Sequence, residues 1–97
     1  MAVTRKSKYQ TSMEIMRNIK DGKGSLSDIL EDTGYPRKVV KDTIGQLRKA
    51  GYLVEIYSEY GTSGEHFEIT KKGDKTLKKF LEVETLLLTH APEILEY

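Results

Sequence analysis

The residues best suited to chemistry are the basic side chains between Pro36 and Ala50, a stretch with five positive charges and one negative. At about 100° per residue in a helix, Val40, Ile44 and Leu47 fall on one apolar face. The opposite face is polar and consists of Lys38, Asp42, Gly45 and Lys49, flanked by Lys41 and Gln46. A row of cationic side chains on one helix face is suited to contact with phosphates.

The same face also offers groups that match base edges. Lys can donate to guanine, Gln can pair with adenine and Asp can accept from cytosine. Lys38 and Gln46 are therefore suited to base edges, and Arg37 and Lys49 are suited to phosphates. Asp42 either contacts cytosine or orients Lys38 one turn earlier. The alternative is a face that is only solvated, as most charged helix faces are.

The residue types do not indicate a metal site or an enzyme active site. The chain has no Cys and two His, and His66 and His90 do not have the paired spacing of metal ligands. No nucleophile elbow, phosphate-binding glycine loop or clustered carboxylate pair occurs. We expect no enzyme, no metal site and no cofactor, whereas a small-molecule effector stays open.

The net charge of +1 hides an uneven distribution along the 97 residues. Residues 1–50 hold 11 Lys and Arg against 6 Asp and Glu, a net charge of +5, whereas residues 51–97 hold 5 against 9, a net charge of −4. The length fits one domain. Because no segment is apolar enough to span a bilayer and the start lacks a secretion signal, we expect a cytoplasmic protein, nucleoid-associated if prokaryotic.

Apolar periodicity and capping residues predict three helices in the first half. The first covers residues 8–21. The second begins with Ser27 as its N-cap, after Leu26 as a hydrophobic staple, and it stops at Gly34. Pro36 then serves as the first residue of the third helix.

The second half predicts a hairpin and a final helix. Strands at about 52–59 and 66–70 are rich in β-branched and aromatic residues and flank the tip Gly61-Thr62-Ser63-Gly64. Thr70 can cap a helix that continues until Pro92. The predicted organisation is a flexible basic arm (1–7), a helical and hairpin domain (8–70) and a C-terminal helix with its tail (71–97).

The segments "TIGQLRKAGYLVEI" and "HFEITKKGDKTL" resemble the recognition-helix end, wing and closing helix of winged-helix regulators of the MarR, ArsR and PadR kinds. They are also similar to small archaeal winged-helix DNA-binding proteins that dimerise through a C-terminal helix. The resemblance covers roughly residues 9–90, and Leu47-x-x-x-Gly51-Tyr52-Leu53 and Ile69-Thr70-Lys71-Lys72-Gly73 are its most specific parts. It implies an α+β winged helix-turn-helix fold, with a three-helix bundle, a β-hairpin wing and an additional C-terminal helix.

The resemblance also implies double-stranded DNA as the partner, with the third helix in the major groove. The residues expected to contact DNA are Arg37, Lys38, Lys41, Asp42, Thr43, Gln46, Lys49, Thr62 and Ser63. Arg5, Lys6 and Lys8 reach an adjacent groove or belong to a disordered tail. Glu59 and Glu65 beside the wing tip would repel phosphates, which keeps a protein-interaction module open as an alternative. A second alternative is an architectural chromatin protein, which would use the same helix face with little sequence preference.

The C-terminal helix carries more apolar surface than one small core needs. Burial of each large apolar side chain contributes about 1.5–3 kcal/mol, so we expect a second copy to cover this surface and form a homodimer. The expected dimer contacts are Leu77, Phe80, Leu81, Leu87 and Leu88. The alternative is that the helix packs against the first helix of the same chain.

Overall fold

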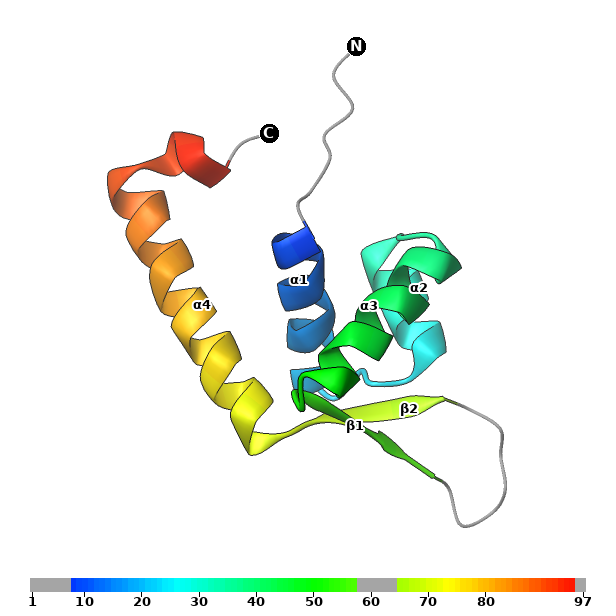
Figure 1. The fold of residues 1–97 in the computed structure, drawn as a ribbon. Coiled ribbons are helices and arrows are strands. Elements are labelled where there is room, and N and C mark those ends of the chain that lie inside the picture. Colours follow the sequence, from blue (N-terminus) through cyan, green and yellow to red (C-terminus); the bar gives the residue numbers. More distant parts are fainter. Residues whose placement is uncertain (1–7, 58–64, 96–97) are drawn as a thin grey trace.

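The computed structural model describes residues 8–57 and 65–95. Its elements, in chain order, are α1 (Lys8–Lys20), α2 (Leu26–Thr33), α3 (Arg37–Lys49), β1 (Leu53–Ile56), β2 (His66–Ile69), α4 (Lys71–His90) and the 3-10 helix η1 (Pro92–Leu95). In Figure 1, α1 lies between α4 on one side and α2 and α3 on the other, and the β1–β2 hairpin crosses below them. This arrangement confirms the predicted α+β winged helix-turn-helix fold with an additional C-terminal helix. Within the described residues, no helix has both the length and the apolar character needed to cross a membrane.

The hydrophobic core surrounds α1. Ile15 and Met16 of this helix are completely buried, because apolar residues recur on its inner face at helical spacing. The other elements contribute the buried side chains Leu26, Ile29, Val40, Ile44, Leu47, Leu53, Phe67, Leu77 and Phe80. The predicted apolar face of α3 is therefore confirmed.

The start of α2 differs from the prediction. Ser25, not Ser27, is the N-cap: its hydroxyl accepts a hydrogen bond from the Asp28 N–H at 3.1 Å. Leu26 consequently lies inside the helix, where its side chain joins the core. The predicted stop is confirmed, because Gly34 adopts φ 70° and donates its N–H to the Leu30 carbonyl.

Two further boundaries shift and one cap is confirmed. Pro36 has ψ 145°, which is extended, so it is the N-cap and α3 begins one residue later. Among the described residues, 53–56 pair with 66–69 in an antiparallel register, so Tyr52, Tyr57 and Thr70, which were predicted to be in strands, lie outside them. Thr70 caps α4 as expected, since its hydroxyl accepts from the Gly73 N–H at 3.0 Å.

The turn between α1 and α2 runs alongside β2 and ties the helices to the hairpin. Phe67 donates its N–H to the Gly24 carbonyl at 2.8 Å, and Leu26 donates to the Glu65 carbonyl at 2.9 Å. A Cβ added to Gly24 would lie 2.2 Å from the Phe67 carbonyl oxygen. Only glycine allows the two backbones to approach this closely.

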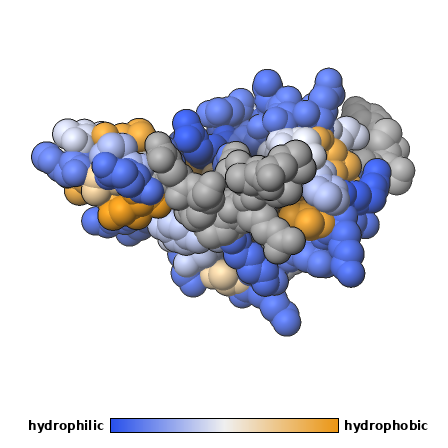
Figure 2. Space-filling model, turned by 90° about the horizontal axis from the view of Figure 1, so that it is seen from above, coloured by the Kyte–Doolittle hydropathy of each residue, from blue (hydrophilic) through white to orange (hydrophobic). Residues whose placement is uncertain are grey.

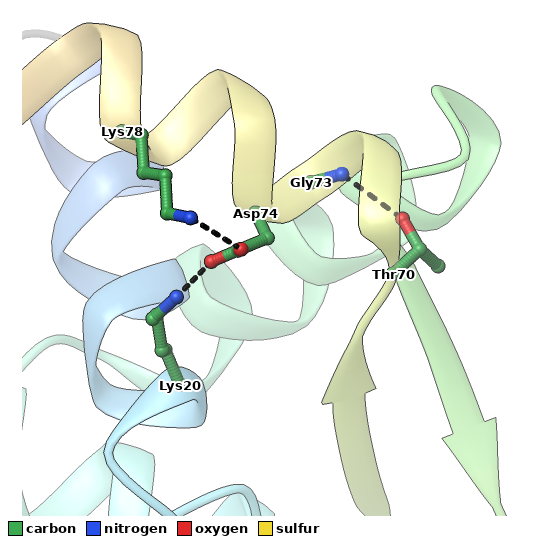
Figure 3. Close-up of polar contacts among 5 residues, drawn as sticks. All are labelled: Lys20, Thr70, Gly73, Asp74 and Lys78. Carbon is green, nitrogen blue, oxygen red and sulfur yellow. Dashed lines mark hydrogen bonds and ion pairs between the residues drawn. The ribbon is translucent and has the colours of Figure 1, made fainter.

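Charged side chains hold the first turns of α4 against α1. The carboxylate of Asp74 accepts a hydrogen bond from Lys20 and lies 3.4 Å from Lys78 Nζ (Figure 3). The hydrogen bond from Lys20 lowers the pKa of Asp74, and the positive charges of Lys20 and Lys78 lower it further. The Thr70 cap and this cluster together fix the angle at which α4 leaves the hairpin.

Substitution Gly24→Ala tests the close approach at β2. We expect the free energy of unfolding to fall by about 1–3 kcal/mol, because the added methyl group must push two paired backbones apart. Urea denaturation at one fixed protein concentration measures this change. Gly45→Ala is the matched control: a Cβ there meets no atom within 4 Å, and alanine favours a helix interior by up to about 1 kcal/mol. Equal stability of Gly24→Ala and the unmodified chain would contradict the prediction.

Substitution Asp74→Asn tests the Lys20–Asp74–Lys78 cluster through pH. The folded pKa lies below the ordinary value of 3.8, so this carboxylate stabilises the fold above that pH and loses its effect as the pH falls through the lowered pKa. We expect Asp74→Asn to be less stable than the unmodified chain at neutral pH, with the difference shrinking below pH 3.8. Thermal melting across this range measures it. Asp42→Asn is the control, because Asp42 is exposed and has no ion pair with any described residue; a pH-independent effect of Asp74→Asn would refute the assignment.

Candidate nucleic-acid interface

The polar face of α3 lies on the protein surface. The exposed side chains include nearly all the contacts predicted on this helix: Arg37, Lys38, Lys41, Asp42, Gln46 and Lys49. The centre of the face, which we call the α3 ridge, consists of Lys38, Asp42, Gly45 and Lys49. Helical periodicity is sufficient to predict this exposure, because the buried stripe of α3 fixes which residues point away from the core.

Thr43 is the exception among the predicted contacts on α3. Its side chain is only 4% exposed, and its hydroxyl donates to the Val39 carbonyl one turn earlier at 2.7 Å. A buried hydroxyl with a partner in its own helix has no reach to a ligand at the surface. We therefore remove Thr43 from the candidate contacts.

One flank of α3 faces the hairpin, and its cations are paired there. Lys41 Nζ lies 3.5 Å from Glu65 Oε1, and Arg48 Nη1 lies 3.4 Å from Glu55 Oε1. Lys41 and Arg48 are called the wing-flank cations below. Arg48 was not among the predicted contacts, although a helical count places it beside Lys41.

The ridge cations Lys38 and Lys49, and Arg37 at the start of α3, are arranged differently from the wing-flank cations. Within residues 8–57 and 65–95, Arg37, Lys38 and Lys49 form no ion pair, and all three are exposed. Asp42 is not paired with Lys38 among these residues, so its predicted orienting role is not visible. The ridge thus offers cationic donors that a phosphate can reach without displacing a carboxylate from the described part of the chain.

Glu55 also affects the ionisation of Tyr57. A hydrogen bond to the Glu55 carboxylate, reinforced by its negative charge, raises the pKa of the Tyr57 phenol. Glu55 itself is the less exposed member of its ion pair, at 18% of its side chain against 46% for Arg48. The carboxylate near the start of the wing is therefore committed to neighbours within the chain.

Several predicted contacts fall outside the described residues. These are Thr62 and Ser63 at the wing tip and Arg5 and Lys6 in the basic arm; Glu59, which was expected to repel phosphates, also lies outside them. Lys8 is the first residue of α1 and is exposed. Within the described part, no group of three or more His, Asp or Glu side chains is placed to hold a metal ion.

The predicted dimer contacts divide into two sets. Leu77 and Phe80 are buried in the core of their own chain, and Leu81 packs against that core. The Phe80 ring meets Tyr9 of α1 edge-on, with centroids 5.0 Å apart. This part of α4 therefore packs against α1 of the same chain, the alternative to a dimer contact, and it leaves Leu77 and Phe80 no surface for a second chain.

The far end of α4 carries the apolar surface that remains. Leu88 is 60% exposed, as predicted, and Val83, Leu86 and Ile94 are also exposed, although the prediction missed them. Figure 2 shows apolar side chains at the end of the molecule formed by α4 and η1. A groove of about 210 Å³ opens there, lined by Tyr9, Gln10, Phe80, Val83, Glu84, Leu87 and Ile94.

The chain is similar to one protein family in sequence and to several solved structures in fold. The model of the family described as "Winged helix-turn-helix" matches residues 5–87. No curated protein matches the sequence. Among solved structures, a PadR-like transcription factor from Bacteroides fragilis superposes with a TM-score of 0.75 at 17% identity, over 90% of this chain and 91% of that one.

Two MarR structures are similar in the same way. One superposes with a TM-score of 0.68 at 12% identity, over 86% of this chain and 65% of that one. A MarR protein from Peptoclostridium difficile superposes with a TM-score of 0.62 at 18% identity, over 92% of this chain and 60% of that one. The chain thus spans less than two thirds of either MarR structure, and at these identities the similarity concerns the fold.

Proposed function

The chain belongs to the winged helix-turn-helix family, and on this basis we propose that it is a transcription regulator that binds double-stranded DNA, with α3 in the major groove. In this fold the recognition helix presents its outward face to base edges and phosphates. The family match and the regulators among the similar structures also support the expectation that the chain is not an enzyme.

The observation that carries the proposal is the α3 ridge. Lys38 and Lys49 are exposed about three turns apart on the helix face opposite the core, and neither is paired with a described carboxylate. Cations with no internal partner gain most from contact with phosphate, because no existing ion pair has to be broken.

Different residues are assigned different roles in this complex. Lys38 and Gln46 contact base edges, where a well-placed pair contributes about 1–3 kcal/mol of discrimination. Arg37 and Lys49 neutralise phosphates and supply affinity that falls with salt. Asp42 accepts from cytosine. Thr62 and Ser63, which lie outside the described residues, are proposed to hydrogen-bond to phosphate without adding charge.

We also propose that the protein is a homodimer joined at the far end of α4. Val83, Leu86, Leu88 and Ile94 gather there with exposed fractions from 48% to 60%. A patch of this kind on one end of a small protein is typical of an interaction surface. A second copy of the chain would cover this patch with its own identical patch, and cyclic dimers are the commonest symmetric assembly.

The protein-interaction module is the competing function, and its main support was the acidic hairpin. Of the two acids that support this alternative, Glu65 is paired with Lys41, and Glu59 lies outside the described residues. Glu55, at the start of the wing, is also paired, with Arg48. That pairing favours the DNA-binding proposal. An architectural role without strong sequence preference uses the same α3 ridge, and duplex selectivity separates it from regulation.

Substitution of the ridge lysines tests DNA binding. We expect Lys49→Ala to weaken binding to all duplexes and to reduce the slope of log affinity against log salt by about 0.9. Lys38→Ala should cost about 1–3 kcal/mol on a duplex selected from a random pool and less on random sequence. Fluorescence anisotropy across a salt titration measures both.

The control for the ridge lysines is Lys79→Ala, which removes the same charge from an exposed position on α4. Binding that is unaffected by both ridge substitutions, with a flat salt dependence, would exclude the DNA-binding proposal. Equal affinity of the unmodified protein for selected and random duplexes would assign the architectural role instead.

Substitution Leu88→Asp tests the dimer. Burial of a leucine contributes about 1.5–3 kcal/mol, and a symmetric interface counts it twice, so the dissociation constant should rise by at least about 100-fold. Light scattering over a range of protein concentrations measures the mass. Thr89→Asp adds the same charge at an exposed, non-apolar neighbour and should leave the dimer intact. A monomeric mass for the unmodified protein at micromolar concentration would rule the dimer out.

A further inference from the structure

The cations of α3 fall into two electrostatic classes. Arg37, Lys38 and Lys49 have no ion-pair partner among the described residues, whereas the wing-flank cations Lys41 and Arg48 each face a carboxylate from the hairpin. Glu55 belongs to β1, whereas Glu65 directly precedes β2. The hairpin therefore neutralises one whole flank of the helix.

Glu65 is held in place by its backbone. Its carbonyl accepts a hydrogen bond from the Leu26 N–H at 2.9 Å, and the next residue, His66, pairs with Ile56 of β1 and bridges to Ser25. Strand pairing on both sides thus fixes the point from which the carboxylate extends. The Glu65 side chain lies beside Lys41 because the fold holds it there.

The Lys41–Glu65 pair remains open to water. Its side chains are 48% and 39% exposed, respectively, so an incoming phosphate can reach the Lys41 ammonium. To bind Lys41 fully, that phosphate must displace Glu65 or tolerate its negative charge at close range. Glu55 is more shielded, with 18% of its side chain exposed, so Glu65 is the more readily displaced of the two carboxylates.

We propose that Glu65 is an affinity-limiting residue, which competes with DNA phosphates for Lys41 and so restricts sequence-independent binding to the cations of the ridge. This inference rests on the proposed function. Sequence-independent affinity increases with the number of phosphates that cations neutralise. Withholding Lys41 lowers that term while the base-reading side chains of the ridge stay available.

The test is the affinity for a random-sequence duplex, measured by anisotropy across a salt titration. We expect Glu65→Gln to bind about two- to five-fold more tightly at low salt, the range set by an exposed ion pair. The salt slope should steepen by about 0.9, because Lys41 gains one phosphate contact. Glu68→Gln is the matched control, since Glu68 is exposed on β2, three residues after Glu65, and has no ion pair with a described residue.

The double substitution isolates the pair. In a Lys41→Ala background, Glu65→Gln should give no more gain than Glu68→Gln gives, because the cation it would release is missing. Unchanged affinity of Glu65→Gln in a protein that binds the duplex would overturn the inference alone. A gain in duplex affinity equal to that of Glu68→Gln, or one that persists in the Lys41→Ala background, would also overturn the inference. Such a gain would show that any carboxylate on the hairpin weakens binding through repulsion of the DNA phosphates. Absence of duplex binding in every variant would overturn the inference and the proposed function together.

Discussion

The hydrogen bond from Phe67 to Gly24 is the contact on which the arrangement of the helices and hairpin depends. It joins the turn before α2 to β2 with an N···O distance of 2.8 Å. The two backbones can approach this closely because Gly24 has no Cβ, which would collide with the Phe67 carbonyl. The Phe67 side chain is 2% exposed within the core. Phe67 thus connects the core, the turn before α2 and β2 of the wing.

The electrostatics of α3 follow from that coupling. Because β2 is fixed against the turn before α2, Glu65 lies beside Lys41, and the pairing of β1 with β2 brings Glu55 beside Arg48. Glu65, which by sequence alone conflicts with DNA binding, and Glu55 are both directed at the flank of α3. Positive charge with no ion-pair partner among the described residues is then concentrated on the ridge, the face that is proposed to contact DNA.

Sequence reasoning predicts those features that depend on local spacing. The buried face of α3, the Gly34 stop and the Thr70 cap all follow from periodicity or capping chemistry. It misplaces the α2 N-cap because Ser25 and Ser27 are equivalent locally, and only the pairing of the preceding turn with β2 favours Ser25. Ion pairs across the fold, and the burial of Leu77 and Phe80 against α1, need the tertiary arrangement.

The two ends of α4 have different surroundings, and this difference would determine how two copies of the chain are placed on DNA. The first turns are fixed to the hairpin by the Thr70 cap and to α1 by the Lys20–Asp74–Lys78 cluster. The far end carries the exposed apolar side chains. In a dimer joined at that end, a helix anchored to each hairpin determines the separation and angle of the two α3 ridges. Half-site spacing on DNA is then a property of α4 as much as of α3.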